Sequence, residues 1–336
     1  MKKTLLTFSW VILFAAVLQG CHFGTFGSWK NDRIEPKVRE EIAVLDKKLF
    51  KAIMTQDVAG VKQLLSPTLL EKSGKKVDTI VNTMGGAFKA TDYKLLDEYY
   101  TKNTSENISN DIPAGKDGGN DYTIKYLALN KEMYVSLMVS TKLPINCLIT
   151  AVYGKYNDGW KLNILHIGEY NILGKTGPDY YAEALKAYDD GNVVDAVNMI
   201  STTGEIATPG GEYFKYNNEA EMKDFYEKVI KEANKQYHLP MVLSQVKTIP
   251  EIFSIRPQMV SDFGKQGVYP MVGYKSGVAL TDTVALKAEN DAIQKVVGTI
   301  FKGIDKNKAY ILYRAFDQIP DGQNYVKHYG FIQKLK

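Results

Sequence analysis

Residues 151–166 read Ala-Val-Tyr-Gly-Lys-Tyr-Asn-Asp-Gly-Trp-Lys-Leu-Asn-Ile-Leu-His and carry the strongest structural signal in the chain. Asp158-Gly159, near the centre of this stretch, is typical of a tight hairpin turn, because glycine readily takes the positive φ that such a turn requires. The flanking residues, 148–156 and 160–172, are rich in the β-branched and aromatic residues that favour strands. The stretch therefore predicts two long antiparallel strands.

The segments before this hairpin predict three helices and then further strands. Apolar residues from 38 to 65 recur at spacings of three and four, and Asp57 divides them into two helices. Ser66-Pro67 ends the second helix, and a third helix is expected over 76–88. The strands that follow are expected in the order 93–100, 122–129 and 133–141, the last two as a hairpin.

This order of helices and strands, ending in Gly159-Trp160-Lys161-Leu162, resembles the nuclear-transport-factor-two-like superfamily. Its members include ketosteroid isomerase, scytalone dehydratase and the SnoaL-like polyketide cyclases. The resemblance covers residues 37–176 and implies a cone-shaped α+β domain, in which three helices pack against a curved antiparallel sheet. It also implies a pocket between the helices and the sheet, but its motifs are patterns of apolar positions and transfer no catalytic residue.

Residues 177–336 are expected to form a second α+β domain that opens with a helical hairpin. The two helices, 180–188 and 193–200, are separated by Asp190-Gly191-Asn192. The later elements are expected to be a helix at 219–236, strands at 241–255 and 268–280, a helix at 284–301 and a strand pair at 309–316 and 325–334.

The N-terminus has the features of a bacterial lipoprotein signal peptide. Lys2-Lys3 precede an apolar run, 5–17, which is too short to span a bilayer and is followed by Leu18-Gln19-Gly20-Cys21. This tetrapeptide resembles the lipobox that lipoprotein signal peptidase cleaves. The resemblance implies that residues 1–20 are removed and that Cys21 becomes the first residue of the mature protein, carrying diacylglycerol and palmitate.

The same resemblance predicts a location in the cell envelope, with the chain anchored to a membrane through Cys21. His22 is not the aspartate that retains lipoproteins in the inner membrane of enteric bacteria, so the outer membrane, facing the periplasm, is expected. Residues 21–36 contain Gly24 and Gly27 and show no helical or strand period, and they are expected to form a tether.

Charge and ligand patterns argue against several classes of function. The net charge is +4, with both signs mixed along the chain, so nucleic-acid binding has no electrostatic support. The histidines show no paired spacing typical of a metal site, and neither a metal nor another cofactor is expected. Cys147 lies in an apolar strand, and it has no partner if Cys21 is acylated, so it is expected to be a buried hydrophobic residue.

His166 is the main catalytic candidate. Strand alternation places it on the same face as Trp160 and Leu162, and this apolar face is expected to lie toward the helices. A histidine there would serve as a general base if a carboxylate lay beside it. The alternative is a core histidine that bonds to a hydroxyl or a backbone group. The carboxylates considered as partners are Asp97, Glu98 and Glu169.

Two short motif matches are incomplete. Lys175-Thr176, between a strand and a helix, resembles a P-loop, but Glu169 stands where that motif requires its first glycine. Ser73, Ser105-Glu106-Asn107 and Lys175-Thr176-Gly177 follow the order of the elements of penicillin-binding enzymes, but they lie too close together for that fold.

The sequence thus favours a lipid-anchored binding or adaptor protein without catalytic activity. Its expected partners are the membrane, through Cys21, and either an envelope protein or a small apolar ligand. One alternative is a small-molecule isomerase, dehydratase or hydrolase that uses the first domain's pocket and His166. Another is a glycan-binding envelope lipoprotein, because tyrosines stack on sugars and occur together at Tyr99-Tyr100, Tyr180-Tyr181 and Tyr325–Tyr329.

Overall fold

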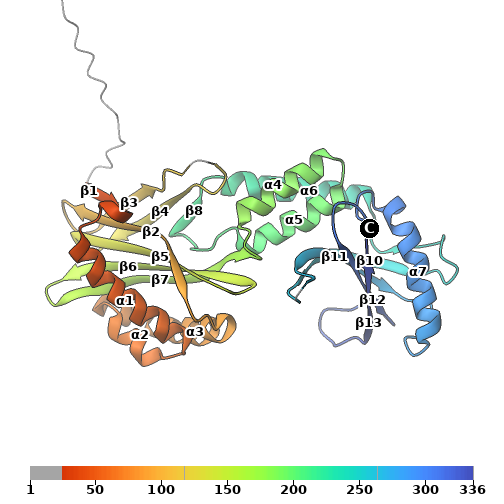
Figure 1. Ribbon diagram of the computed structural model, residues 1–336, viewed down its shortest axis with the longest axis horizontal. Helices are drawn as coiled ribbons and strands as arrows, with labels where there is room; N and C mark the ends of the chain where they lie inside the picture. Colours follow the sequence, from red (N-terminus) through yellow and green to blue (C-terminus); the bar gives the residue numbers. More distant parts are fainter. Residues whose placement is uncertain (1–24, 117, 263, 336) are drawn as a thin grey trace, which may run out of the picture.

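The computed structural model describes residues 25–116, 118–262 and 264–335, and it shows a mixed α+β chain with two lobes and a group of helices between them (Figure 1). Its sheets are mostly antiparallel. The α+β class predicted from the sequence is therefore confirmed. The expected signal peptide and Cys21 lie outside the described residues.

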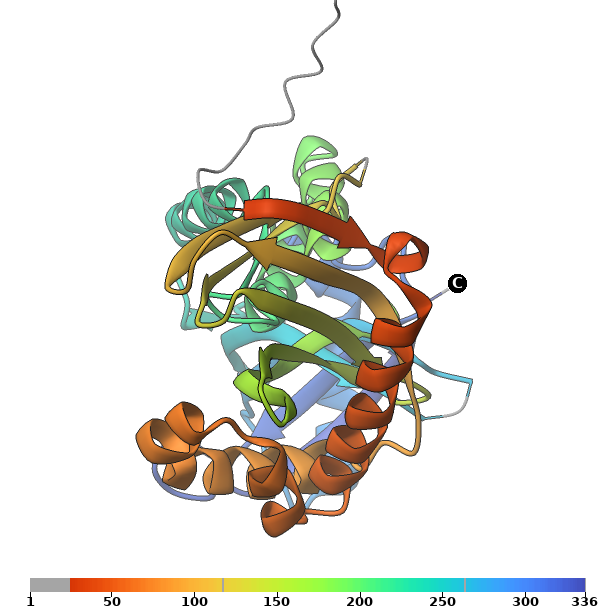
Figure 2. The same ribbon diagram turned by 90° about the vertical axis from the view of Figure 1, so that its left-hand side faces the viewer.

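Three helices cover one face of a five-stranded sheet in the first lobe (Figure 2). Asp57 and Ser66 cap the second and third helices by accepting hydrogen bonds from the backbone of Gly60 and Leu69. Pro67 starts the third helix well before residue 76, because proline suits the first turn of a helix. The helices are α1 (Pro36–Met54), α2 (Val58–Leu64) and α3 (Pro67–Phe88); the sheet order is β1 (Thr25–Lys30), β2 (Tyr93–Asn103), β5 (Glu132–Ser140), β6 (Ile145–Tyr156) and β7 (Gly159–Ile172).

The β6–β7 hairpin confirms the strongest sequence prediction. The strands are antiparallel, Tyr156 pairs with Gly159, and Gly159 has the positive φ that the turn requires. The helices meet this part of the sheet through buried apolar residues. Those of α1 include Ile42, Leu49 and Ile53, which pack in one cluster with residues of β5, β6 and β7.

A second sheet packs on the opposite face of the large one. Its order is β3 (Ile108–Pro113), β4 (Tyr122–Ala128) and β8 (Phe214–Tyr216). The predicted hairpin of 122–129 with 133–141 is wrong, because β4 pairs with β3 and β8 whereas β5 pairs with β2 and β6. Every second residue of β4 is buried and packs in the layer between the two sheets. This packing requires β4 to belong to a sheet that faces the large one and not to the large sheet itself.

The tether expected over 21–36 is wrong from Thr25 onward. Residues 25–30 form β1, which pairs antiparallel with β2, and a short 3₁₀ helix, Asn31–Arg33, leads into α1. Two side-chain contacts hold β1 on the sheet edge. Trp29 stacks on Tyr100 with 5.4 Å between the ring centroids, and the Thr25 hydroxyl donates to the Asn110 side chain at 2.9 Å.

The helices between the lobes confirm the predicted helical hairpin, α4 (Gly177–Asp189) and α5 (Val193–Ile206), followed by α6 (Glu219–Gln236). Between α5 and α6, however, the chain returns to the first lobe as β8, and Tyr216 pairs with Tyr122 of β4. The boundary expected between residues 176 and 177 therefore separates strands of one sheet.

The second lobe is a five-stranded sheet whose core includes α7. The Asp282 side chain caps this helix by accepting a hydrogen bond from the Ala285 amide. Strands β11 and β12 are parallel, and α7 provides the long connection that such a pair needs. The sheet order is β13 (His328–Lys334), β12 (Tyr310–Phe316), β11 (Gly267–Lys275), β10 (Glu251–Val260) and β9 (Met241–Val242), and α7 spans Thr283–Ile300.

The return of β8 gives a testable domain boundary. A fragment of residues 25–176 is expected to aggregate or to unfold at a lower urea concentration than one of residues 25–236, because it lacks Phe214 and exposes the edge of β4. Urea unfolding followed by circular dichroism measures both midpoints. Equal midpoints for the two fragments would contradict the boundary.

Candidate functional site

His166 does not face the helices, because β7 contains a bulge. Leu162 pairs with Tyr153 and Ile164 with Val152, so Asn163 is the extra residue between them. The bulge reverses the alternation: Leu162 packs among the helix-facing residues, whereas Ile164 packs between the two sheets. The prediction that His166 shares the face of Trp160 and Leu162 is therefore wrong.

The His166 ring lies beside the loop before β8. It approaches Gly211 and Tyr213, with 6.3 Å between the ring centroids of His166 and Tyr213. Burial lowers the pKa of His166, and its Nδ1 atom is buried without a hydrogen-bond partner. This environment favours a neutral histidine, which matches the alternative of a packed histidine better than a catalytic one.

The proposed partner carboxylates serve other contacts. Asp97 binds two lysines, and Glu98 binds Arg39 and Tyr134 on the helix side of the sheet. Glu169 pairs with Cys147 in the β6–β7 register.

The other sequence candidates have structural roles. Cys147 is buried, as predicted, and burial raises the pKa of its thiol. Thr176 caps α4 in a reciprocal arrangement with Asp179, and Lys175 forms an ion pair with Glu183. The tyrosine segments differ: Tyr99, Tyr100 and Tyr180 are buried, whereas Tyr325 and Tyr329 are exposed.

A cavity among the described residues has a volume of about 670 Å³, within the usual range of small-molecule sites. Its lining residues belong mainly to β4 and β8 of the small sheet and to α5 and α6, the elements labelled in Figure 1. His166 is not among its lining residues. They are Thr123, Lys125, Ile200, Thr203, Gly204, Ala207, Thr208, Lys215, Tyr216, Asn217, Glu219, Ala220, Met222, Lys223 and Tyr226.

The surface of this cavity is mostly apolar. Ile200, Tyr216 and Met222 are buried, and Met222 packs in the core between the sheets. Gly204 lies within α5, and a Cβ atom added there would meet no other atom within 4 Å. Glycine disfavours a helix, and nothing in the packing requires it here. Gly204 is exposed, so α5 leaves open space at this position.

Replacing Gly204 with alanine is expected to raise the free energy of unfolding by about 0.5–1 kcal/mol, because alanine favours the helix and its methyl group meets empty space. Gly85→Ala is the opposing control, since a Cβ at Gly85 would lie 2.1 Å from the Ile53 carbonyl oxygen. Urea titration of both variants measures the difference. A Gly204→Ala protein less stable than the wild type would contradict the open space around position 204.

The rim of the cavity carries positive charge. Lys125, Lys215 and Lys223 come from β4, β8 and α6, and Glu219 is the one acidic residue among the lining side chains that the structure describes. Lys215 lies 3.1 Å from Glu219. The arrangement combines an apolar interior with a cationic entrance, which suits a ligand that has both an apolar and a polar part.

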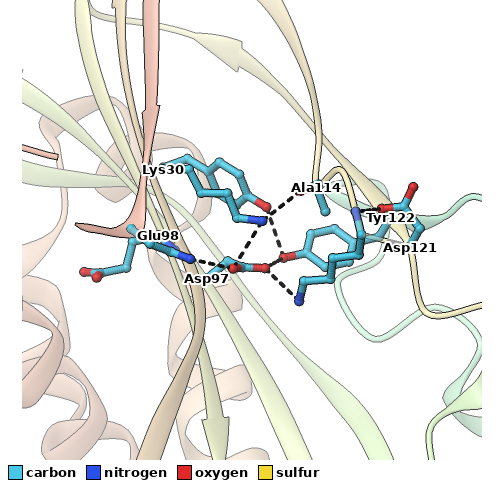
Figure 3. A network of polar contacts seen from close by, with 9 residues as sticks. Lys30, Asp97, Glu98, Ala114, Asp121 and Tyr122 are labelled. Carbon is cyan, nitrogen blue, oxygen red and sulfur yellow. Dashed lines mark hydrogen bonds and ion pairs between the residues drawn. The ribbon is translucent and has the colours of Figure 1, made fainter. Parts of the chain in front are cut away.

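A separate polar network surrounds Asp97, between β1 and the small sheet (Figure 3). Its carboxylate lies 3.3 Å from the Lys30 ammonium and 2.8 Å from the Lys116 ammonium, and it accepts hydrogen bonds from Asn31 and Tyr122. Burial acts to raise the pKa of Asp97, but these contacts outweigh it and the pKa is lowered. The network joins β1, β2 and the loop before β4, and it is a structural clamp.

Asp46 is a buried carboxyl group on the helix side of the sheet. It lies on α1, and the Tyr153 hydroxyl donates to it at 2.8 Å. Burial raises the pKa of Asp46 to about 7. A smaller cavity of about 270 Å³ lies nearby on α1 and is lined by Arg39 and Glu98, but Asp46 does not line it.

No family model, curated protein or solved structure matches this chain. Within the described residues, no group of three or more histidine, cysteine, aspartate or glutamate side chains is placed to hold a metal ion. No helix in the same part of the chain is long and apolar enough to span a membrane.

Sequence reasoning missed both Gly204 and Asp46, although each left a signal. Gly204 interrupts a helical run, and Asp46 falls in the apolar stripe of Ile42, Leu49 and Ile53. A charged residue in such a stripe indicates a buried polar contact.

Proposed function

We propose that this protein is a lipid-anchored cell-envelope protein that binds a small apolar ligand in the cavity between α5, α6, β4 and β8. The observation that carries the proposal is the cavity itself, with its apolar interior and the open space beside Gly204. Binding without catalysis is favoured, because His166 lies outside the lining.

The anchor rests on the sequence Leu18–Cys21. Because β1 begins at Thr25, only residues 22–24 separate Cys21 from the sheet. A chain of this length spans at most about 14 Å when fully extended. We place the anchored lobe close to the membrane, with the periplasmic face of the outer membrane as the proposed site. Globomycin should cause an unprocessed precursor to accumulate, and normal processing in its presence would contradict the anchor.

We also propose that the first lobe is a cone-shaped member of the nuclear-transport-factor-two-like superfamily. Three helices on one face of an antiparallel sheet that ends in a long hairpin support this assignment. The small sheet on the other face would be an addition. Failure of these helices and strands to superpose together on ketosteroid isomerase would exclude it.

One observation favours the alternative of a small-molecule isomerase, dehydratase or hydrolase. Asp46, with a pKa of about 7, lies between helices and sheet, where the superfamily keeps its pocket. Neither cavity described above includes Asp46 in its lining. The binding function therefore has the better structural support.

Ligand capture tests the proposed function. The mature protein, purified from envelope extracts of its host, is examined by native mass spectrometry as wild type, Gly204→Leu and Gly74→Leu. Gly204→Leu places a bulky side chain on the wall of the cavity, whereas a side chain at Gly74 of α3 lies outside it and meets only ordinary packing distance, 3.7 Å from Leu70. We expect a bound apolar molecule in the wild type and Gly74→Leu but not in Gly204→Leu. An empty wild type, or equal occupancy in all three, would refute the function.

A further inference from the structure

We propose that the ligand is an acidic amphiphile: a single hydrocarbon chain with a carboxylate or phosphate head group. This inference rests on the proposed function and specifies the chemistry of the same cavity. The chain would occupy the apolar interior, and the head group would lie at the rim.

The interior suits a flexible hydrocarbon chain. The part formed by α5 and by Ala207, the residue that follows it, consists of small or apolar residues, including Ile200, Thr203 and Gly204. Met222 of α6 contributes a flexible side chain that adapts to the shape of an apolar ligand. Hydrocarbon gains from leaving water for such a surface without needing polar partners.

The rim suits an anion. Among the described side chains, three lysines and one glutamate line the cavity, so cationic groups outnumber anionic groups in this part of its lining. The lysines belong to β4, β8 and α6, and they approach the entrance from different elements. An acidic head group would reduce this repulsion, whereas an ammonium head group would increase it.

Two of these lysines, Lys125 and Lys223, have partners that leave them available. Lys125 pairs with Asp111 at 3.2 Å and Lys223 with Glu227 at 4.0 Å, and both pairs are substantially exposed. Exposed ion pairs contribute little to stability. Turning an ammonium group from such a partner toward a ligand therefore costs little.

The cavity is lined partly by α6, which lies on the same side of the first lobe as β1, the strand that would follow the proposed anchor. In Figures 1 and 2, β1 and α6 lie on the side away from α2 and α3. Amphiphiles concentrate in membranes, so a cavity on this side would lie near the membrane that contains the proposed ligand.

Probe displacement tests the inference with the full mature protein. The neutral dye N-phenyl-1-naphthylamine reports occupancy of the cavity, and palmitate, hexadecyl phosphate, 1-hexadecanol and hexadecylamine compete with it. We expect at least one of the two acids to displace the dye at a concentration about tenfold lower than the alcohol, and the amine to be the weakest. The two acids distinguish a carboxylate from a phosphate ligand.

A matched pair of triple variants assigns the effect to the rim. Replacing Lys125, Lys215 and Lys223 with glutamine should remove the acid preference. The control replaces Lys75, Lys76 and Lys131, which are exposed and do not line the cavity, and it should keep the preference. Raising the salt concentration from about 0.05 M to about 0.5 M should weaken the preference in the wild type, and this reading does not depend on the variants.

The outcomes separate the two proposals. Equal displacement by acids and alcohol, or a preference that the rim variant retains, overturns the acidic ligand while the cavity still binds the dye. Failure of the wild type to bind the dye, or unchanged binding by Gly204→Leu, overturns the proposed function itself.

Discussion

Replacing Asp46 with asparagine is expected to raise the free energy of unfolding by about 3 kcal/mol at pH 8 and to change it little at pH 4. Asp46 is only 1% exposed, and burial raises its pKa from 3.8 to about 7. A buried carboxyl group resists ionisation, so the folded state holds this proton more tightly than the unfolded state.

The sign of the pH dependence follows from that difference. The stability that Asp46 contributes is fully present below pH 3.8 and is lost as the pH rises through about 7. The shift corresponds to about 4 kcal/mol, and slightly less than this falls between pH 4 and pH 8, because the unfolded carboxyl group is already partly ionised at pH 4. Asparagine does not ionise, so the variant avoids the loss at high pH.

Urea unfolding at a series of pH values between 4 and 8 tests this expectation. Asp224→Asn, at an exposed position of α6, is the matched control and should not alter the pH profile. An Asp46→Asn protein that is less stable than the wild type at pH 8 would contradict the burial of an ionisable group at this position.

Replacing Asp97 with alanine is expected to lower the free energy of unfolding by about 3 kcal/mol at pH 7. The Asp97 side chain is 5% exposed, whereas Lys30 and Lys116 are 30% and 32% exposed. The lysines can turn toward water, which keeps the loss at the low end for a broken buried pair. Most of the expected loss in the free energy of unfolding comes from the hydrogen bonds that Asn31 and Tyr122 donate to the carboxylate.

The Asp97 effect has the opposite pH dependence to that of Asp46. The folded-state pKa of Asp97 is lowered below 3.8, so its stabilisation is present above that pH and is lost as the pH falls through the folded value. The difference between wild type and variant should therefore shrink in strong acid.

Asp111→Ala is the control for this prediction, because Asp111 pairs with Lys125 at the surface, with 35% and 49% of the two side chains exposed. Its loss should cost less than about 1 kcal/mol. Hydrogen exchange should also show faster opening of β1 in Asp97→Ala, since Lys30 and Asn31 lose their anchor. An equal effect of the two substitutions would contradict the clamp.

Local patterns in the sequence were sufficient for most of the helices and for the main hairpin. The period of apolar residues identified α5, α6 and α7, and Asp158-Gly159 identified the β6–β7 turn. These signals act between residues that are close in the chain, so propensity and capping express them directly.

Strand pairing between distant segments could not be read in the same way. The short β8 and the edge strand β1 are stabilised by partners far away in sequence, Tyr122 and Tyr100 among them. The bulge at Asn163 carries no sequence signal, yet it reversed the expected face of His166. The cavity could not be predicted from the sequence either, because its lining comes from four elements that only the fold brings together.

The return of the chain as β8 also sets an order of assembly. The large sheet and β4 are synthesised well before residues 214–216. Until β8 is made, one edge of β4 in the first lobe has no strand paired with it. For a chain that crosses a membrane N-terminal end first, α4 and α5 must also emerge before that edge is covered. The early chain is then most open to chaperones and proteases at β4, and closure by β8 marks the moment at which the first lobe becomes resistant.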